Sequence, residues 1–234
     1  MRTLATLCAT AALAVTLTGT AQAELTQKEQ SIIPIAALTA QGNEPALRRM
    51  LNQGLDNGLT VNEIKAVLEQ MYAYTGFPRS LTALNVFVKV LEDRKAEGKK
   101  TVVGKEPSPL PKGKTIRELG TATQTELVGR PVTGAVYEFS PNIDTYLKEH
   151  LFGDIFANDV LNYRQRELAT VAALAALPAP AQLRSHLNVC LNVGLTPEEL
   201  QEFVDVMKFK VADKSHTLAR NTVKAVLEAR QQKK

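Results

Sequence analysis

The sequence predicts an all-α protein that contains two tandem copies of one helical unit. Of its 234 residues, 44% are hydrophobic but only 5% are aromatic, and Trp is absent. Few Gly, Pro and aromatic residues disfavour sandwiches and propellers and favour Ala- and Leu-rich helices. The second observation is an internal repeat, because residues 28–94 align without a gap with residues 164–230 at a constant offset of 136. An ungapped match of this length indicates a duplication, so each copy serves as a structural control for the other.

The first 23 residues have the pattern of a cleavable secretory signal. Arg2 precedes an apolar stretch over residues 4–17, and the three residues that end at Ala23 form a small-x-small cleavage site. The stretch is shorter than the ~20 residues that span a bilayer, so a membrane anchor is the less favoured alternative. We therefore expect a periplasmic or secreted protein without stable membrane insertion. Cleavage after Ala23 would leave Cys190 as the single thiol.

The aligned copies share the signals that begin and end helices. In each copy a Gly suited to the left-handed end of a helix is followed by Thr, an N-cap residue, and then by Glu, which completes a capping box. These positions are Gly58, Thr60 and Glu63 in the first copy and Gly194, Thr196 and Glu199 in the second. Together with the apolar periodicity they predict four helices in each copy. The predicted ranges are 27–41, 44–57, 60–75 and 78–97, followed by 160–177, 180–193, 196–212 and 215–232.

The stretch between the copies divides into a linker and an extension of the second copy. Residues 98–114 are rich in Lys, Gly and Pro, a composition typical of an exposed linker. Further on, Ser140 can cap a short helix that Pro141 opens. We therefore assign residues 24–97 to a degenerate first repeat and residues 115–234 to a larger domain that carries the candidate active site.

Two aligned positions differ in a way that the fold does not require. His186 corresponds to Met50, and Glu167 corresponds to Ser31. Since Glu167 and His186 flank a proline-rich turn near Leu177 at nearly equal distances, they can face each other on antiparallel helices. An imidazole held by a buried carboxylate is the arrangement that a general acid or base needs. The alternative is a core histidine whose polar atoms a neighbour satisfies.

Four further residues are weaker candidates. Cys190 lies one helical turn beyond His186, so it is either a thiolate activated by the imidazole or, as we favour, a small buried apolar residue. Arg166 and Arg184 flank the pair and can bind a substrate carboxylate; the alternative for each is a solvated or ion-paired side chain. His216, near the start of the last helix, is a weaker candidate for substrate binding.

Composition and motifs also exclude several classes of function. The net charge of +4 is small and scattered along the chain, so a nucleic-acid partner is not expected. The sequence has no Gly-rich phosphate loop, no nucleophile elbow and no His/Cys cluster with metal-ligand spacing. We therefore expect a small molecule as the partner, and no metal site.

Two segments, RQRELATVAALAAL and QLRSHLNVCLNVGLTPEEL, resemble the carboxymuconolactone decarboxylase family of the alkylhydroperoxidase D-like superfamily. The resemblance covers most of residues 116–234 and, in degenerate form, residues 27–94. Redox members of the superfamily resemble a pattern of Glu, eleven residues, Cys-x-x-Cys, three residues and His. Aligned on the candidate pair, this pattern places its two cysteines on Ala179 and Gln182. Because neither position is Cys, peroxiredoxin-type peroxide reduction through a dithiol is less favoured than decarboxylase-like activity.

The resemblance implies an all-helical bundle without metal or organic cofactor, and the duplication within it suggests a homotrimer. It implies a lyase or isomerase for a small carboxylic acid or lactone, in which His186 is the acid/base, Glu167 orients it, and Arg166 or Arg184 binds the substrate anion. Because catabolism through carboxymuconolactone is normally cytoplasmic, the export signal favours a different acid or lactone. The alternatives are thiol-dependent peroxide reduction by Cys190, and a non-catalytic helical oligomer that binds a small molecule.

Overall fold

The protein is helical throughout, as the sequence predicts. The computed structural model describes residues 24–211 and 213–232, and the predicted signal lies outside them. No strand occurs in this part of the chain. The elements are α1 (Gln27–Gln41), α2 (Glu44–Asp56), α3 (Val61–Ala96), α4 (Ile116–Val128), α5 (Ala135–Phe139), α6 (Pro141–Thr145), the π-helix η1 (Tyr146–Phe156), α7 (Tyr163–Ala176), α8 (Pro180–Asn192), α9 (Pro197–Lys210) and α10 (Asp213–Gln231). No helix within these ranges is long and apolar enough to cross a bilayer.

The helix boundaries repeat with the offset found in the sequence. Both ends of α2 and α8 are 136 residues apart, and so are the starts of α1 and α7 and of α3 and α9. The predicted break between the third and fourth helices is confirmed within α3, where Gly76 takes a left-handed φ of 78°. Gly58 and Gly194 both have φ 92°, and the Thr60 and Thr196 capping boxes both form.

One predicted helix start and one predicted helix cap differ from the observed structure. The helix predicted from residue 160 begins at Tyr163, because the Asn162 side chain accepts a hydrogen bond from the Gln165 N–H and caps it there. Pro141 opens α6 as predicted. The prediction that Ser140 caps this helix is wrong, since its side chain makes no capping hydrogen bond.

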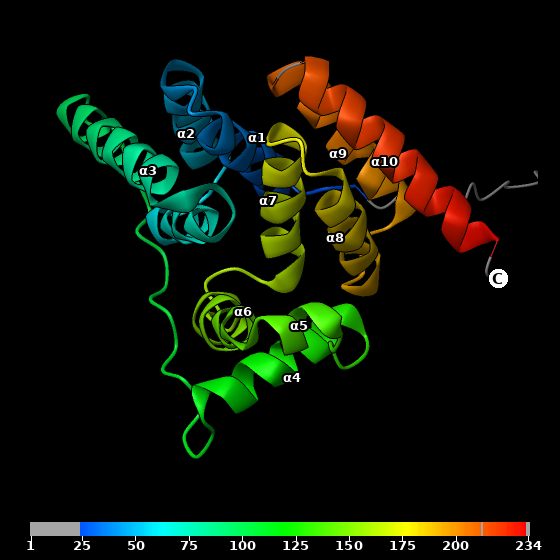
Figure 1. Ribbon diagram of the computed structural model, residues 1–234. Helices are drawn as coiled ribbons and strands as arrows, with labels where there is room; N and C mark the ends of the chain where they lie inside the picture. The colour runs from blue at the N-terminus through cyan, green and yellow to red at the C-terminus, as the bar shows by residue number, and fades with distance from the viewer. Residues whose placement is uncertain (1–23, 212, 233–234) are drawn as a thin grey trace, which may run out of the picture.

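The two copies pack against each other across the centre of the molecule, mainly through their first helices. Helix α1 packs along α7, and Figure 1 shows α7 in the middle of the view with α1 behind it. Each copy's first helix also contacts the third helix of the other copy, α1 with α9 and α7 with α3. Apolar side chains of both copies therefore share one core, to which Ile32, Ile35, Leu168 and Val171 contribute without exposed surface.

The linker is exposed over most of its length, but it is attached to the body at two points. The backbone N–H groups of Val61 and Asn62 donate to carbonyls of the linker at 2.9 Å. At the other point, Asp159 accepts hydrogen bonds from the backbone N–H of Ser108 and from the Lys105 ammonium. These bonds hold the pKa of the Asp159 carboxyl well below its usual range. The linker thereby fixes the extension of the second copy to the first.

The extension forms a separate layer, which lies beneath α7 and α8 in Figure 1. Within it α4 packs closely on η1, since a Cβ at Gly120 would lie 1.6 Å from the Lys148 carbonyl oxygen. A small second core joins this layer to α8 and consists of Leu127, Leu151, Phe152, Phe156 and Val189. In the described part of the chain the first copy has no corresponding layer. We refer to α4, residues 129–140, α6 and η1 as the cover.

Candidate active site

The structure brings Glu167 and His186 together across the α7–α8 turn. The two helices run antiparallel because the chain leaves the helical region at Leu177 and restarts a helix at Pro180. His186 Nδ1 and Glu167 Oε2 are 2.9 Å apart, a hydrogen-bonding distance. With Glu167 ionised, Nδ1 carries the proton, and the lone pair of Nε2 is left to accept one.

The two side chains of this pair differ in exposure. Glu167 is 1% exposed at its side chain, whereas His186 is 17% exposed. The second carboxylate oxygen, Oε1, is buried without a hydrogen-bond partner among the described residues. An unsatisfied buried carboxylate oxygen costs free energy, so its retention needs a reason other than packing.

His186 and Glu167 line a partly open cavity of about 590 Å³ between the repeat helices and the cover. The Tyr74 ring contacts the imidazole edge-on, with 5.9 Å between ring centroids. The polar or charged side chains around the cavity are Gln124, Arg130, Thr133, Glu167, Gln182, Ser185 and His186. The remaining lining residues are Ala73, Tyr74, Leu127, Val128, Val132, Val136, Tyr137, Ile143, Leu147, Leu151, Phe152, Leu174 and Val189. A largely apolar cavity with a few polar groups is typical of a small-molecule site.

The structure does not place Arg166 in this cavity, contrary to the prediction. Its guanidinium is buried and donates to Gln70 Oε1 at 3.0 Å and to the Asn158 carbonyl at 2.6 Å. Burial lowers the pKa of Arg166 to about 10, and at neutral pH the group stays charged. Gln70 belongs to the third helix of the other copy, so Arg166 is committed to holding the two copies together.

Arg184 and His216 do not line the cavity either. Arg184 is exposed on α8, and it lies two residues before His186. Two residues turn a helix by about 200°, which directs the Arg184 side chain to the opposite face. His216 is on α10, which packs against the outer side of the second copy.

Cys190 is a buried residue without a place in the cavity. It has no exposed surface, and burial raises the pKa of the thiol well above its usual value, with the Glu167 carboxylate adding to the effect. A neutral, inaccessible thiol is a poor nucleophile. This geometry agrees with the favoured interpretation of Cys190 as a small buried residue.

Several lining residues escaped the sequence analysis. Gln182 and Ser185 are on the same helix as His186, and the four-residue spacing from Gln182 was a usable signal. Tyr74 corresponds to Lys210 in the second copy, a difference that the repeat alignment also contains. Arg130 has no such signal, because it lies in the cover, outside the duplicated segments.

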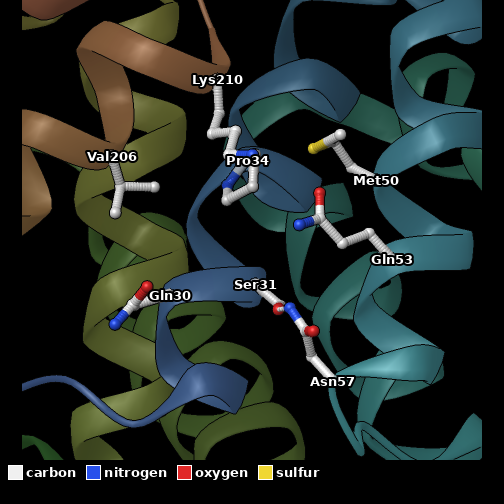
Figure 2. Close-up of a pocket in the computed structure, with 8 residues that line it drawn as sticks. All are labelled: Gln30, Ser31, Pro34, Met50, Gln53, Asn57, Val206 and Lys210. Atoms are coloured by element: carbon white, nitrogen blue, oxygen red, sulfur yellow. Dashed lines mark hydrogen bonds between the residues drawn. The ribbon is translucent and has the colours of Figure 1, made fainter.

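The first copy carries a reduced version of this site, shown in Figure 2. Ser31 and Met50 line a cavity of about 50 Å³, together with Lys210 from the third helix of the other copy. The Ser31 hydroxyl donates to the Gln27 carbonyl at 2.7 Å and accepts from Asn57 Nδ2 at 2.9 Å. Its polar atoms are therefore satisfied, unlike those of Glu167.

Comparison with known proteins agrees with the duplicated helical fold. The model of the carboxymuconolactone decarboxylase family matches residues 5–89 and 141–215, which together exceed half of the chain. The chain is a member of the carboxymuconolactone decarboxylase family. The two matched ranges start 136 residues apart, the offset of the repeat, and the first range begins within the segment predicted to be a signal.

Two curated relatives match part of the chain. A 4-carboxymuconolactone decarboxylase of Acinetobacter baylyi is 29% identical over 89 residues, which cover 36% of this chain and 66% of that protein. An uncharacterized protein of Methanocaldococcus jannaschii is 28% identical over 71 residues, which cover 30% of this chain and 66% of that protein. The chain thus spans slightly less than two thirds of the length of these relatives, and the likeness supports function at the level of the family.

Proposed function

We propose that this family member is a cofactor-free lyase or isomerase that acts on a carboxylic acid or lactone, with His186 as general acid/base and Glu167 as the residue that orients it. The observation that carries the proposal is the Glu167–His186 pair at an open cavity, 2.9 Å apart, in one of two copies that otherwise share their helices. The fold forms without the pair in the first copy, where Ser31 and Met50 stand.

The pair supports proton transfer in both directions. Neutral His186 accepts a proton from the substrate at Nε2, and the resulting imidazolium is stabilised by the carboxylate bonded at Nδ1. In an isomerisation the same proton returns to another atom of the substrate. In a decarboxylation the carbon–carbon bond breaks, carbon dioxide leaves, and the electron pair left on carbon takes the proton from the imidazolium.

Tyr74 supports the imidazole of His186 through its ring. Its hydroxyl is buried without a partner among the described residues. Burial, reinforced by the nearby Glu167 carboxylate, raises the pKa of the phenol well above its usual value. The phenol therefore stays protonated at neutral pH, and the ring of Tyr74, rather than its inaccessible hydroxyl, meets His186.

We also propose that the protein is exported and forms a homotrimer. The leader pattern supports export, and exposed apolar side chains on the second half of α3 support assembly: Phe77 and Leu81 are 60% and 54% exposed. Their face continues to Val88, while the residues aligned with Leu81 and Val88 in α10 are the polar Thr217 and Lys224. Light scattering of the mature chain tests the trimer.

Turnover by a His186→Gln variant tests the catalytic proposal. Glutamine keeps an N–H group for Glu167 but cannot carry the proton, so kcat should fall by about 10²–10⁴-fold. The first substrates to assay are 4-carboxymuconolactone and related lactone acids, with loss of the lactone followed by absorbance. His216→Gln is the matched control and should retain full turnover. Equal activity of the two variants would contradict the assignment.

A further inference from the structure

We propose that the cavity binds an elongated amphipathic acid, whose anionic group pairs with Arg130 and whose apolar body lies along the cover toward His186. This rests on the proposed function only for what happens at His186. The binding of the anion and of the apolar body follows from the cavity itself.

The volume of the cavity favours a substrate larger than a bare lactone acid. At the ~30 Å³ that each molecule occupies in liquid water, 590 Å³ corresponds to on the order of twenty non-hydrogen atoms. Most of the lining is apolar, and the apolar residues gather on the cover, for example Val132, Val136 and Ile143. A bare polar ring would leave this surface in contact with water, whereas a hydrocarbon body would bury it.

Arg130 is the only Lys or Arg among the described residues that line the cavity. In this part of the chain no carboxylate forms an ion pair with its guanidinium. The charge is therefore available to a ligand, and a guanidinium fits a carboxylate with two parallel hydrogen bonds. The imidazole of His186, which is 17% exposed and lines the cavity, makes the other end polar.

The distance between the two ends sets the length of the ligand. Helix α4 ends at Val128, and its C-cap Gly129 directly precedes Arg130. Asn192 Nδ2 donates to the Leu127 and Val128 carbonyls at 3.1 Å. Asn192 follows His186 by six residues, which is roughly 9 Å along the α8 axis. A ligand held at Arg130 therefore needs a chain of several bonds to bring another atom to the imidazole.

Residues 129–139, which include Arg130, are accessible where such a ligand would lie. None of the residues 129–139 is buried, although Val132, Val136 and Tyr137 line the cavity. Val136 alone is 58% exposed. A bound apolar chain would remove these side chains from water, and backbone amides in the segment would exchange their hydrogens more slowly.

The test is a calorimetric titration of the full mature chain with butanoate, hexanoate, octanoate and decanoate, and with the amides of the same acids. Affinity should rise about fourfold per added methylene until the cavity is filled. Each acid should bind about 10- to 100-fold more tightly than its amide. Arg130→Gln should abolish this preference, Arg130→Lys should keep part of it, and Arg184→Gln, the matched control, should keep all of it.

Two results would overturn the inference: equal binding of acid and amide by the unaltered protein, or an undiminished preference in Arg130→Gln. Thermal unfolding of each variant shows whether it is folded. His186→Gln should bind decanoate as the unaltered protein does, because the imidazole does not hold the anion. Lost turnover with retained decanoate binding in His186→Gln supports the catalytic proposal independently of the anion site. Retained turnover with a lost preference for acids in Arg130→Gln supports the anion site independently of the catalytic proposal.

Discussion

The two copies of the repeat build the same helices around different cavities. In the first copy Ser31 and Met50 line about 50 Å³, and every polar atom of Ser31 is satisfied (Figure 2). In the second copy Glu167 and His186 line about 590 Å³, and one oxygen of Glu167 has no partner among the described residues. Since α2 and α8 have equivalent boundaries, the helical hairpin does not depend on the ionisable pair.

The difference separates the features that the helical hairpin needs from those that it does not. A buried carboxylate is costly to desolvate, and the first copy shows that the hairpin folds with a hydroxyl in its place. The cover supplies the second difference, since it encloses the cavity of the second copy alone in the described part of the chain. The pair and the cover together distinguish the candidate site from its counterpart.

The largest effect is expected from His186→Met, which copies one residue of the first repeat. It leaves the Glu167 carboxylate buried without its hydrogen-bond partner, so the free energy of unfolding should fall by about 3–5 kcal/mol. Urea denaturation measures this loss in the free energy of unfolding. The matched control is Arg184→Met on the same helix, which should change stability by less than about 0.5 kcal/mol. Similar losses in the two variants would show that the pair is not coupled.

The Cys190 thiol should be strongly protected from alkylation in the folded protein. Cys190 is aligned with Gly54, where an added Cβ would lie 3.1 Å from Ile35 and Leu59 side-chain atoms, so both copies need a small residue here. Because burial raises the pKa of Cys190, the folded protein keeps the thiol neutral as pH rises. Iodoacetamide should therefore react with the native chain at least ~100-fold more slowly than with the unfolded chain, whose rate rises near pH 8.5.

This measurement also tests the peroxidase alternative. If the alkylation rate of the native chain rises below pH 8, Cys190 is an accessible thiolate, and thiol-dependent peroxide reduction is again a candidate function. Cys190→Ala should leave turnover of a lactone acid unchanged, because the side chain does not line the cavity.

A smaller effect is expected when the cover is loosened. Gly120→Ala forces a Cβ against the Lys148 carbonyl, and separating α4 from η1 should cost about 1–3 kcal/mol. The shared core of the two copies does not include this contact, so hydrogen exchange should accelerate in the cover and stay slow in α1 and α7. Gly113→Ala is a control with no atom within 4 Å of the added Cβ, although φ there is +80°. Uniform acceleration in Gly120→Ala would mean that the cover and the repeats unfold together.

The smallest effect is expected from Ser31→Ala in the first copy. The change removes the acceptor of the Asn57 amide, so stability should fall by about 0.5–1.5 kcal/mol. Turnover and carboxylate binding should not change, because this cavity is separate from the proposed site. Lost activity in Ser31→Ala would assign chemistry to the first copy as well.

Local signals in the sequence were sufficient for most of the repeats. Capping residues at Thr60 and Thr196 and glycines at 58 and 194 set the helix ends, and comparing the copies identified Glu167 and His186 as a pair that can meet. The comparison worked because the same helical hairpin occurs twice, with and without the ionisable groups.

Contacts between distant segments were the part that the sequence did not reveal. Arg166 is sequestered by Gln70, which comes from the other copy, and no local spacing indicates that contact. Arg130 lies in the cover, where the π-helix η1 departs from the 3.6-residue period and no second copy offers a comparison. Nearness in sequence to the pair therefore predicts Arg166 and Arg184 as anion-binding residues, whereas the cavity is lined by Arg130.

We propose that the second copy keeps Glu167 and His186 for chemistry and not for folding. The most direct test is the free energy of unfolding of the double variant Glu167→Ser/His186→Met, which copies the first repeat, measured with its turnover. We predict stability equal to or above that of the unaltered chain, a full recovery of what His186→Met alone loses, and no turnover. A double variant that is less stable than His186→Met, or that still turns over substrate, would contradict the claim.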